Sequence, residues 1–216
     1  MYETEIKILG IDRKEVEGRL VSSGAVKVFD GDIHALYYDT AEGSIRQARG
    51  AFRLRKEDDI AVLTYKAHIS DNDAKIRQEK EVRVSDFGTM RSILESTGFS
   101  VWLEMEKHRT TYELGAVHFE LDKYHGAYEY IPEFLEIEGP DIETVYASAS
   151  MLGFQAKDCR PWDSYKLAQY YSSGGSHANV TSNSSFPQVK RDGNPSCRKG
   201  KILATGESPR RPDKPE

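Results

Sequence analysis

The sequence predicts an α+β protein in which helices pack on the outside of a closed antiparallel β-barrel. Two observations support this fold class. At least six segments place charge on one strand face and mostly apolar residues on the other, because successive side chains of a strand alternate between faces. Three further segments carry apolar residues at helical spacing and end at a glycine. A flat sheet with one face in water also fits, but a closed barrel explains more, because its mixed charges converge on an enclosed lumen.

The first strand, residues 2–8, shows the alternation most clearly. One face carries Glu3, Glu5 and Lys7, and the other carries Tyr2, Thr4, Ile6 and Ile8. For this segment alone, a charged face in contact with water is the more common arrangement. The recurrence of the pattern along the chain favours an enclosed charged surface instead.

The remaining elements follow in chain order. Further strands are expected at residues 34–39, 51–56, 60–66, 77–84, 102–114, 117–122 and 134–138. Helices are expected over 11–21, from Asp86 to Gly98 and from Asp141 to Gly153, with Pro161 in the first turn of a short last helix. Residues 41–50, 70–75 and 123–132 are expected to be loops. Because the three longer helices each stop at a glycine followed by an apolar residue, the sequence also indicates a rough internal repeat.

Composition separates a body from a tail. Residues 1–171 hold 22 Lys and Arg against 31 Asp and Glu, a net charge of −9, which argues against general nucleic-acid binding. Residues 172–216 are rich in Ser, Gly and Pro and lack apolar periodicity. We therefore expect a tunnel-forming domain over 1–171 and a disordered tail over 172–216, of which 199–216 could be foreign to the native chain.

Cysteine content and hydropathy indicate the compartment. The two cysteines cannot form a disulfide framework, and no segment approaches the roughly 18 apolar residues of a membrane span. The chain also enters a strand at its first residues, with no apolar signal segment. The sequence therefore predicts a cytoplasmic protein without a membrane partner, and it leaves the oligomeric state open.

The charged strand faces carry both signs. Converging carboxylates repel one another and lose hydration, so an enclosed set of them requires cations. Hard oxygen ligands suit Mg²⁺ or Mn²⁺, whereas guanidinium and ammonium groups match phosphate oxygens. The two signs together predict a divalent metal ion and a polyphosphate group in one lumen.

Seven short motifs carry these charges. They are Glu-x-Glu-x-Lys at 3–7, Arg-Leu-Arg at 53–55, Leu-Thr-x-Lys at 63–66, Glu-x-Glu at 79–81, Lys-x-Arg at 107–109, Asp122, and Phe-Leu-Glu-Ile-Glu-Gly at 134–139. In this order they resemble the CYTH domain, a family that joins class IV adenylyl cyclases and thiamine triphosphatases within the triphosphate tunnel metalloenzymes. The resemblance covers about residues 1–171 and implies an eight-stranded barrel whose lumen is a triphosphate tunnel.

The resemblance also implies residue roles. The implied metal ligands are Glu3, Glu5, Asp122, Glu136 and Glu138. The implied substrate-binding cations are Lys7, Arg53, Arg55, Lys66, Lys107 and Arg109. The implied catalytic set is Glu3, Glu5, Lys7, Glu79 and Glu81. Within it, Glu79 and Glu81 could bind metal, orient the cations or help to bind or activate the attacking group.

The expected activity is metal-dependent hydrolysis of a triphosphate, with tripolyphosphate, ATP or thiamine triphosphate as the candidate substrates. One alternative is a class IV adenylyl cyclase, which makes cyclic AMP and pyrophosphate from ATP, and another is a module that binds polyphosphate or nucleotide without turnover. A cyclase must hold the ribose in line with the α-phosphate, which requires a surface that binds the base. The sequence offers only the loop from Tyr124 to Tyr130 for that purpose, so hydrolysis is favoured.

Overall fold

The computed structural model describes residues 2–174. Nearly all of the predicted tail therefore lies outside the described residues. The described part contains no helix that is long and apolar enough to cross a membrane.

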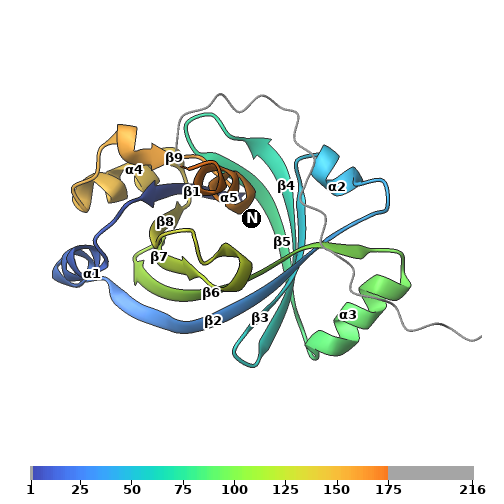
Figure 1. Ribbon diagram of the computed structural model, residues 1–216. Coiled ribbons are helices and arrows are strands. Elements are labelled where there is room, and N and C mark those ends of the chain that lie inside the picture. The colour runs from blue at the N-terminus through green and yellow to red at the C-terminus, as the bar shows by residue number, and fades with distance from the viewer. Residues whose placement is uncertain (1, 175–216) are drawn as a thin grey trace, which may run out of the picture. The chain divides into compact units, whose positions relative to one another are not determined.

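Nine strands form one antiparallel sheet. Their bounds are β1 (Tyr2–Leu9), β2 (Val26–Asp39), β3 (Ala51–Glu57), β4 (Ile60–Ser70), β5 (Lys75–Val84), β6 (Ser100–Leu114), β7 (Val117–Tyr124), β8 (Phe134–Gly139) and β9 (Cys159–Arg160). Hydrogen bonds join eight of them in the order β5-β4-β3-β2-β6-β7-β8-β1, and pairing of β1 with β5 closes the ring seen in Figure 1. The predicted closed, eight-stranded antiparallel barrel is confirmed.

Strand β1 closes the barrel because its two edges serve three partners. One edge pairs with β8 from Thr4 to Leu9. The other edge pairs with β5 near its beginning and with the short β9 at Lys7 and Ile8. The charged and apolar faces of β1 are thereby fixed relative to both neighbours, since a shift of one residue would exchange them.

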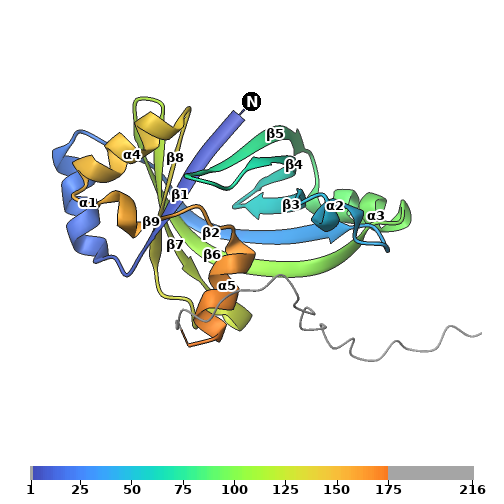
Figure 2. The same ribbon diagram turned by 90° about the horizontal axis from the view of Figure 1, so that it is seen from above.

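Five α-helices lie outside the ring (Figures 1 and 2). They are α1 (Arg13–Ser22), α2 (Ser44–Gln47), α3 (Phe87–Ser96), α4 (Ile142–Met151) and α5 (Ser164–Ser172), and two short 3₁₀ helices are η1 (Gly126–Tyr128) and η2 (Ala156–Asp158). Each helix except α2 begins after an aspartate whose carboxylate accepts a backbone N–H of the first turn at 2.6–3.1 Å. Such N-caps satisfy amide groups that otherwise have no partner in the helix.

The apolar outer face of the barrel packs against these helices. Val16 and Leu20 of α1 and Val145 of α4 belong to one buried cluster with Ile6 and Phe119 of the strands. On the other side of the ring, Leu94 of α3 packs against strands β2 and β3. Burial of each such aliphatic side chain contributes about 1.5–3 kcal/mol to folding. The helices therefore cover the outside of the barrel and leave the charged face to line its interior.

The two halves of the barrel repeat one pattern. A strand, a helix and a three-stranded meander occur as β1-α1-β2-β3-β4 and again as β5-α3-β6-β7-β8. The first strand of each half pairs with the last strand of the other, as β1 with β8 and β5 with β4. Gly24 and Gly98 follow the two helices with φ of 84° and 96°, a conformation that other residues rarely adopt. The expected repeat is therefore present in two units, and α4 with Gly153 lies after the second unit and does not begin a third.

Several boundaries differ from the sequence expectation. Strand β2 begins at Val26 rather than at residue 34, because its first half pairs with the end of β6. The expected loop at 41–50 contains α2, whose backbone amides are held by the buried carboxylate of Asp39. Helix α5 begins at Ser164 with Asp163 as its cap, so Pro161 precedes the helix instead of lying in its first turn. Pairing between distant strands and hydrogen bonds from aspartate side chains cause these three differences in element boundaries.

Candidate active site

The barrel register places all the predicted site residues on the interior face. Residues directly opposite on paired strands share a face, and the interior face includes the pairs Lys7 with Glu136 and Arg109 with Asp122. The complete set comprises Glu3, Glu5, Lys7, Arg53, Arg55, Lys66, Glu79, Glu81, Lys107, Arg109, Asp122, Glu136 and Glu138. Segments distant in sequence therefore contribute to one lumen.

The two charge signs occupy different parts of the lumen wall. Three neighbouring strands, β7, β8 and β1, carry what we call the acidic wall, formed by Glu3, Glu5, Glu120, Asp122, Glu136 and Glu138. Strands β3, β4 and β6 carry the basic wall, formed by Arg53, Arg55, Lys66, Lys107 and Arg109. Lys7 is a cation within the acidic wall, and Glu79 and Glu81 lie on β5, where the two walls meet.

Asp122 joins the two walls. Its carboxylate accepts Lys107 Nζ at 2.6 Å and the Nε and Nη2 groups of Arg109 at 2.7 and 2.6 Å. Asp122 is fully buried, yet these cations outweigh the effect of burial and hold its pKa well below the usual range. Arg109 also forms an ion pair with Glu120. Both carboxylates are therefore directly paired with the basic wall.

Lys7 links the carboxylates of β1 and β8. Its buried ammonium donates to Glu136 at 2.7 Å and to Glu5 at 3.0 Å. Lys75 donates to the same Glu5 oxygen at 2.6 Å. Burial raises the pKa of Glu5, but Lys7, Lys75 and Lys66 outweigh it and hold the pKa well below its ordinary value. Glu5 is thus ionised and shared between two lysines.

The carboxyl groups of Glu3 and Glu79 form a hydrogen-bonded pair beside Lys66. Lys66 Nζ lies 2.5 Å from Glu3 and 3.3 Å from Glu79. Burial, with Glu5 nearby, raises the pKa of Glu3 well above its usual value, whereas Glu79 has a pKa lowered to about 2 by its hydrogen bond to Glu3 and by Lys66. Burial therefore favours the protonated form of Glu3 more than that of Glu79.

Arg53 has donors that no residue between 2 and 174 satisfies. Its guanidinium bonds to the phenol oxygen of Tyr37, but Nε and Nη2 are buried and have no hydrogen-bond partner within residues 2–174. Leaving a buried donor without a partner costs about 1–3 kcal/mol, and more for a charged group. The basic wall therefore presents a fork of N–H groups that an anion would complete.

Three carboxylates of the acidic wall could hold a metal ion. Glu120, Asp122 and Glu136 each offer an oxygen, and these oxygens lie within 4.8 Å of one another. All three residues are buried and supply the hard ligands that Mg²⁺ or Mn²⁺ prefers. Glu3, Glu5 and Glu138 lie in the same wall but outside this group. Burial and neighbouring carboxylates, Glu120 first among them, raise the pKa of Glu138 to about 8.

Sequence reasoning missed three interior residues. Glu120 alternates with Asp122 on the same strand face, so parity alone indicated its position. The sequence predicts a connecting loop at Lys75, but Lys75 lies opposite Glu5 in the pairing of β5 with β1. Tyr37 lies opposite Arg53, and this pairing of β2 with β3 has no local signature in the sequence.

The aromatic segment at the end of β7 divides into a buried and an exposed part, with Tyr124 inside the fold and Tyr130 47% exposed. Tyr124 is buried, donates its hydroxyl to Ser164 Oγ at 2.9 Å, and stacks on Phe134 with ring centroids 5.9 Å apart. Tyr130 donates to the backbone oxygen of Ala168 at 3.2 Å. Helix α5 therefore contacts both Tyr124 and Tyr130, and only Tyr124 is buried by the packing.

The fold and the lumen define a class of protein in which acidic and basic side chains together line the inside of an antiparallel barrel. A family model for the CYTH domain matches residues 1–158. A protein of Methanocaldococcus jannaschii, named putative adenylate cyclase, is 31% identical over 141 residues, which cover 64% of this chain and 77% of the relative. The chain belongs to the CYTH domain family.

Solved structures share this fold. A putative adenylate cyclase of Vibrio parahaemolyticus has a TM-score of 0.69 at 16% identity, covering 78% of this chain and 98% of its own. A Pyrococcus horikoshii protein has a TM-score of 0.65 at 22% identity, covering 76% and 98%. A putative adenylyl cyclase of Hippeastrum, described as having a dominant triphosphatase activity, has a TM-score of 0.54 at 17% identity, covering 80% and 95%. At these identities the solved structures show a shared fold alone.

Proposed function

We propose that this protein is a metal-dependent triphosphatase, which transfers the terminal phosphoryl group of tripolyphosphate, ATP or thiamine triphosphate to water. The observation that carries the proposal is Arg53, whose buried Nε and Nη2 groups have no partner among the described residues. In the same lumen, Glu120, Asp122 and Glu136 form a buried carboxylate group. An anion would accept the open N–H groups of Arg53, and a divalent cation would neutralise the three carboxylates.

The acidic wall would hold Mg²⁺ or Mn²⁺ through Asp122 and Glu136 with Glu120, and the ionised Glu5 adds negative charge to the same wall. Glu3 and Glu138, whose pKa values are raised, would add charge only after losing a proton. A divalent ion bound there would neutralise charge on the phosphate oxygens and orient the phosphoryl group. Lys107 and Arg109 would then exchange their bonds to Asp122 for bonds to phosphate. This exchange keeps the buried charges paired, which a low-dielectric interior requires.

The basic wall positions the substrate. Arg53 offers its two open donors, and Arg55, Lys66, Lys107 and Arg109 supply further positive charge along β3, β4 and β6. Phosphoryl transfer depends mainly on such positioning and charge neutralisation, so no protein nucleophile is needed. Glu79 and Glu81 lie beside Lys66 and Arg55 and orient these two cations.

The second candidate is a class IV adenylyl cyclase, which the name of the Methanocaldococcus jannaschii relative favours. A cyclase must also fix the ribose and base, and the burial of Tyr124 against α5 withdraws this ring from any stacking surface at that loop. Hydrolysis places no such demand, because water attacks the terminal phosphorus.

One assay separates the two reactions. The protein is incubated with ATP and, separately, with tripolyphosphate in the presence of Mg²⁺ or Mn²⁺, and the products are resolved by chromatography. We expect orthophosphate from both substrates, loss of this product in Arg53→Ala, and no change in Lys56→Ala, an exposed neighbour on β3. Cyclic AMP and pyrophosphate from ATP, with inert tripolyphosphate, would establish the cyclase instead. Tight binding of triphosphate without any product would indicate a binding module.

A further inference from the structure

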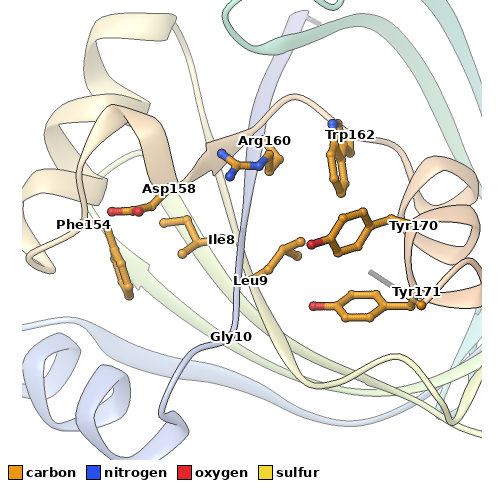
Figure 3. A pocket seen from close by; sticks show the side chains of 10 residues that line it. Ile8, Leu9, Gly10, Phe154, Asp158, Arg160, Trp162, Tyr170 and Tyr171 are labelled. Carbon is orange, nitrogen blue, oxygen red and sulfur yellow. The ribbon is translucent and has the colours of Figure 1, made fainter. Parts of the chain in front are cut away.

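A cavity lies apart from the two charged walls, where β1, β9 and α5 meet. It has a volume of about 650 Å³, which falls within the size range of sites that bind small organic molecules, and Figure 3 shows the side chains that line it. Of the described residues that line this cavity, none belongs to the acidic wall or the basic wall. The proposed phosphoryl transfer therefore leaves the cavity without a role.

Aromatic rings line the α5 side of the cavity. Tyr170 and Tyr171 lie in the last turn of α5, and Trp162 precedes the helix. The Tyr170 ring has its centroid 5.0 Å from that of Trp162 and 5.1 Å from that of Tyr171, so the three rings form one continuous surface. Leu9 of β1 and Phe154, which follows α4, add apolar surface on the other side (Figure 3). The cavity therefore suits an apolar or aromatic group.

Arg160 is a half-buried cation that lines the same cavity. Its Nη1 group donates to the backbone oxygen of Cys159 at 2.9 Å and to that of Lys157, and these bonds fix the guanidinium, which lies 6.0 Å from the centre of the Trp162 ring. Within residues 2–174, Arg160 forms no ion pair, and its Nε and Nη2 groups have no hydrogen-bond partner. This fixed pair of N–H donors matches the two oxygens of a carboxylate.

The charges around the cavity favour a ligand with a single negative charge. Asp158 also lines the cavity, and its carboxylate accepts the backbone N–H of Gln155 at 2.9 Å in the capping box of η2. A ligand with two or more negative charges would exceed the charge of Arg160 and be repelled by this carboxylate, whereas one carboxylate group balances Arg160. A carboxylate attached to an aromatic ring therefore fits both the guanidinium and the apolar surface.

We propose that this cavity is a binding site for small aromatic carboxylates. The carboxylate group pairs with Nε and Nη2 of Arg160, and the ring packs between the tyrosines of α5 and Leu9. Because only the folded chain brings β1, β9 and α5 together, such a ligand binds the folded state alone and raises the melting temperature. The site lies outside the proposed catalytic machinery, so the inference goes beyond the proposed function and does not depend on it.

The test measures the affinity of naphthoate by calorimetry, with naphthamide and acetate as comparison ligands. Naphthamide keeps the aromatic rings without the charge, whereas acetate keeps the charge without the rings. We expect naphthoate to bind about tenfold or more tightly than either compound and to raise the melting temperature of the native chain. Equal affinities for naphthoate and naphthamide, or no binding of naphthoate, would overturn the proposal.

Variants locate the bound anion. Arg160→Gln should weaken naphthoate binding about tenfold or more, because it removes the charged pair of donors. Lys157→Gln is the matched control, since it removes the same charge from an exposed neighbour that does not line the cavity, and its affinity should stay within about twofold of the native value. If Arg160→Gln does not fold, as judged by its melting curve, Arg160→Lys should weaken binding about threefold or more, because an ammonium group lacks the planar fork. Unchanged affinity in the folded variant would refute the site.

Arg53→Ala separates this site from the basic wall, which also attracts anions. We expect naphthoate to bind Arg53→Ala as it binds the native chain, and saturating tripolyphosphate to leave its affinity unchanged. Loss of naphthoate binding in Arg53→Ala, with binding retained in Arg160→Gln, would place the anion in the lumen and overturn the proposal. Naphthoate binding that depends on Arg160 in a protein without triphosphate turnover would support this site and refute only the proposed function.

Discussion

The two faces of β6 carry charge pairs of similar length in different surroundings. Toward the lumen, Lys107 reaches Asp122 at 2.6 Å. Toward the outside, the intervening His108 reaches Asp32 at 2.8 Å. The side chain of Asp122 is 0% exposed, whereas that of Asp32 is 82% exposed. The two pairs have similar lengths but differ in burial.

Burial makes the inner ion pairs destabilising to break. It also makes them suitable for replacement by a bound cation and a bound anion. Removing one partner of a buried pair leaves an uncompensated charge, which costs about 3–5 kcal/mol, whereas an exposed pair contributes about 0–1 kcal/mol. An incoming cation and anion can replace the inner partners without leaving a charge unpaired. The same strand can therefore carry a functional network on one face and a weak surface cluster on the other.

The largest contrast is expected between Asp122→Asn and Asp32→Asn. The inner change leaves Lys107 and Arg109 without their shared counter-charge, so the free energy of unfolding should fall by about 3 kcal/mol or more. Because an amide also lacks the charge that a divalent ion requires, binding of Mn²⁺ should be lost. Urea denaturation and calorimetry measure both effects. Equal stability losses in the two variants would contradict the role of burial.

The next contrast is between Glu5→Gln and Glu138→Gln, two neighbours in the acidic wall. Both should reduce turnover by about 10- to 100-fold, because each removes a carboxyl group from the wall that carries the metal group. Only Glu5→Gln also removes the partner of Lys7 and Lys75, so it should lower the free energy of unfolding more. Turnover at limiting and saturating Mg²⁺, together with melting curves, tests this assignment. Unchanged turnover in either variant would exclude that residue from the metal site.

A third contrast lies on β3, where Arg53 and Lys56 occupy opposite faces. Arg53→Ala should weaken tripolyphosphate binding about tenfold while changing binding of orthophosphate much less, because several cations act together on the longer anion. Arg55→Ala and Lys66→Ala should behave similarly, and Lys56→Ala should leave both affinities unchanged. Calorimetric titration with the two anions gives the result. Equal losses for both anions would indicate a structural role for Arg53.

The sequence predicts those features of the site that depend on the alternation of side chains along a single strand. The alternation at Glu3, Glu5 and Lys7 identifies the inner face of β1, because a strand has a period of two residues whatever its partners are. The recurrence of that alternation also predicts the closed barrel. These features depend on neighbours in sequence and need no knowledge of the pairing.

The remaining features depend on contacts between distant segments. Lys75 enters the lumen only because β5 pairs with β1, and Tyr37 contacts Arg53 only because β2 pairs with β3. The sequence predicts a last helix, but the position of α5 against Tyr124 and Phe134 follows from apolar packing between distant segments. Non-local packing, rather than local propensity, sets these positions.

The smallest expected effect concerns His108 on the outer face of β6. Its imidazole contacts Asp32 at 2.8 Å and Asp30 at 2.9 Å, and these carboxylates raise the pKa of His108 above its usual value. Lys27 also bonds to Asp30, whose pKa is lowered to about 2. Asp30 therefore remains ionised at every pH at which His108 gains or loses its proton. A raised pKa means that the folded state binds the proton more tightly than the unfolded chain does.

The stabilising contribution of His108 is therefore fully present below the unfolded pKa of about 6.5 and is lost as pH rises through the higher folded pKa. Because the cluster is exposed, the contribution should not exceed about 1 kcal/mol and should decrease with added salt. His108→Ala should lower the free energy of unfolding at pH 5.5 by more than at pH 8.5, while triphosphate turnover stays unchanged at both. Urea denaturation of the native chain and the variant at the two pH values measures this difference. A loss at pH 8.5 as large as that at pH 5.5 would show that His108 acts through packing rather than charge.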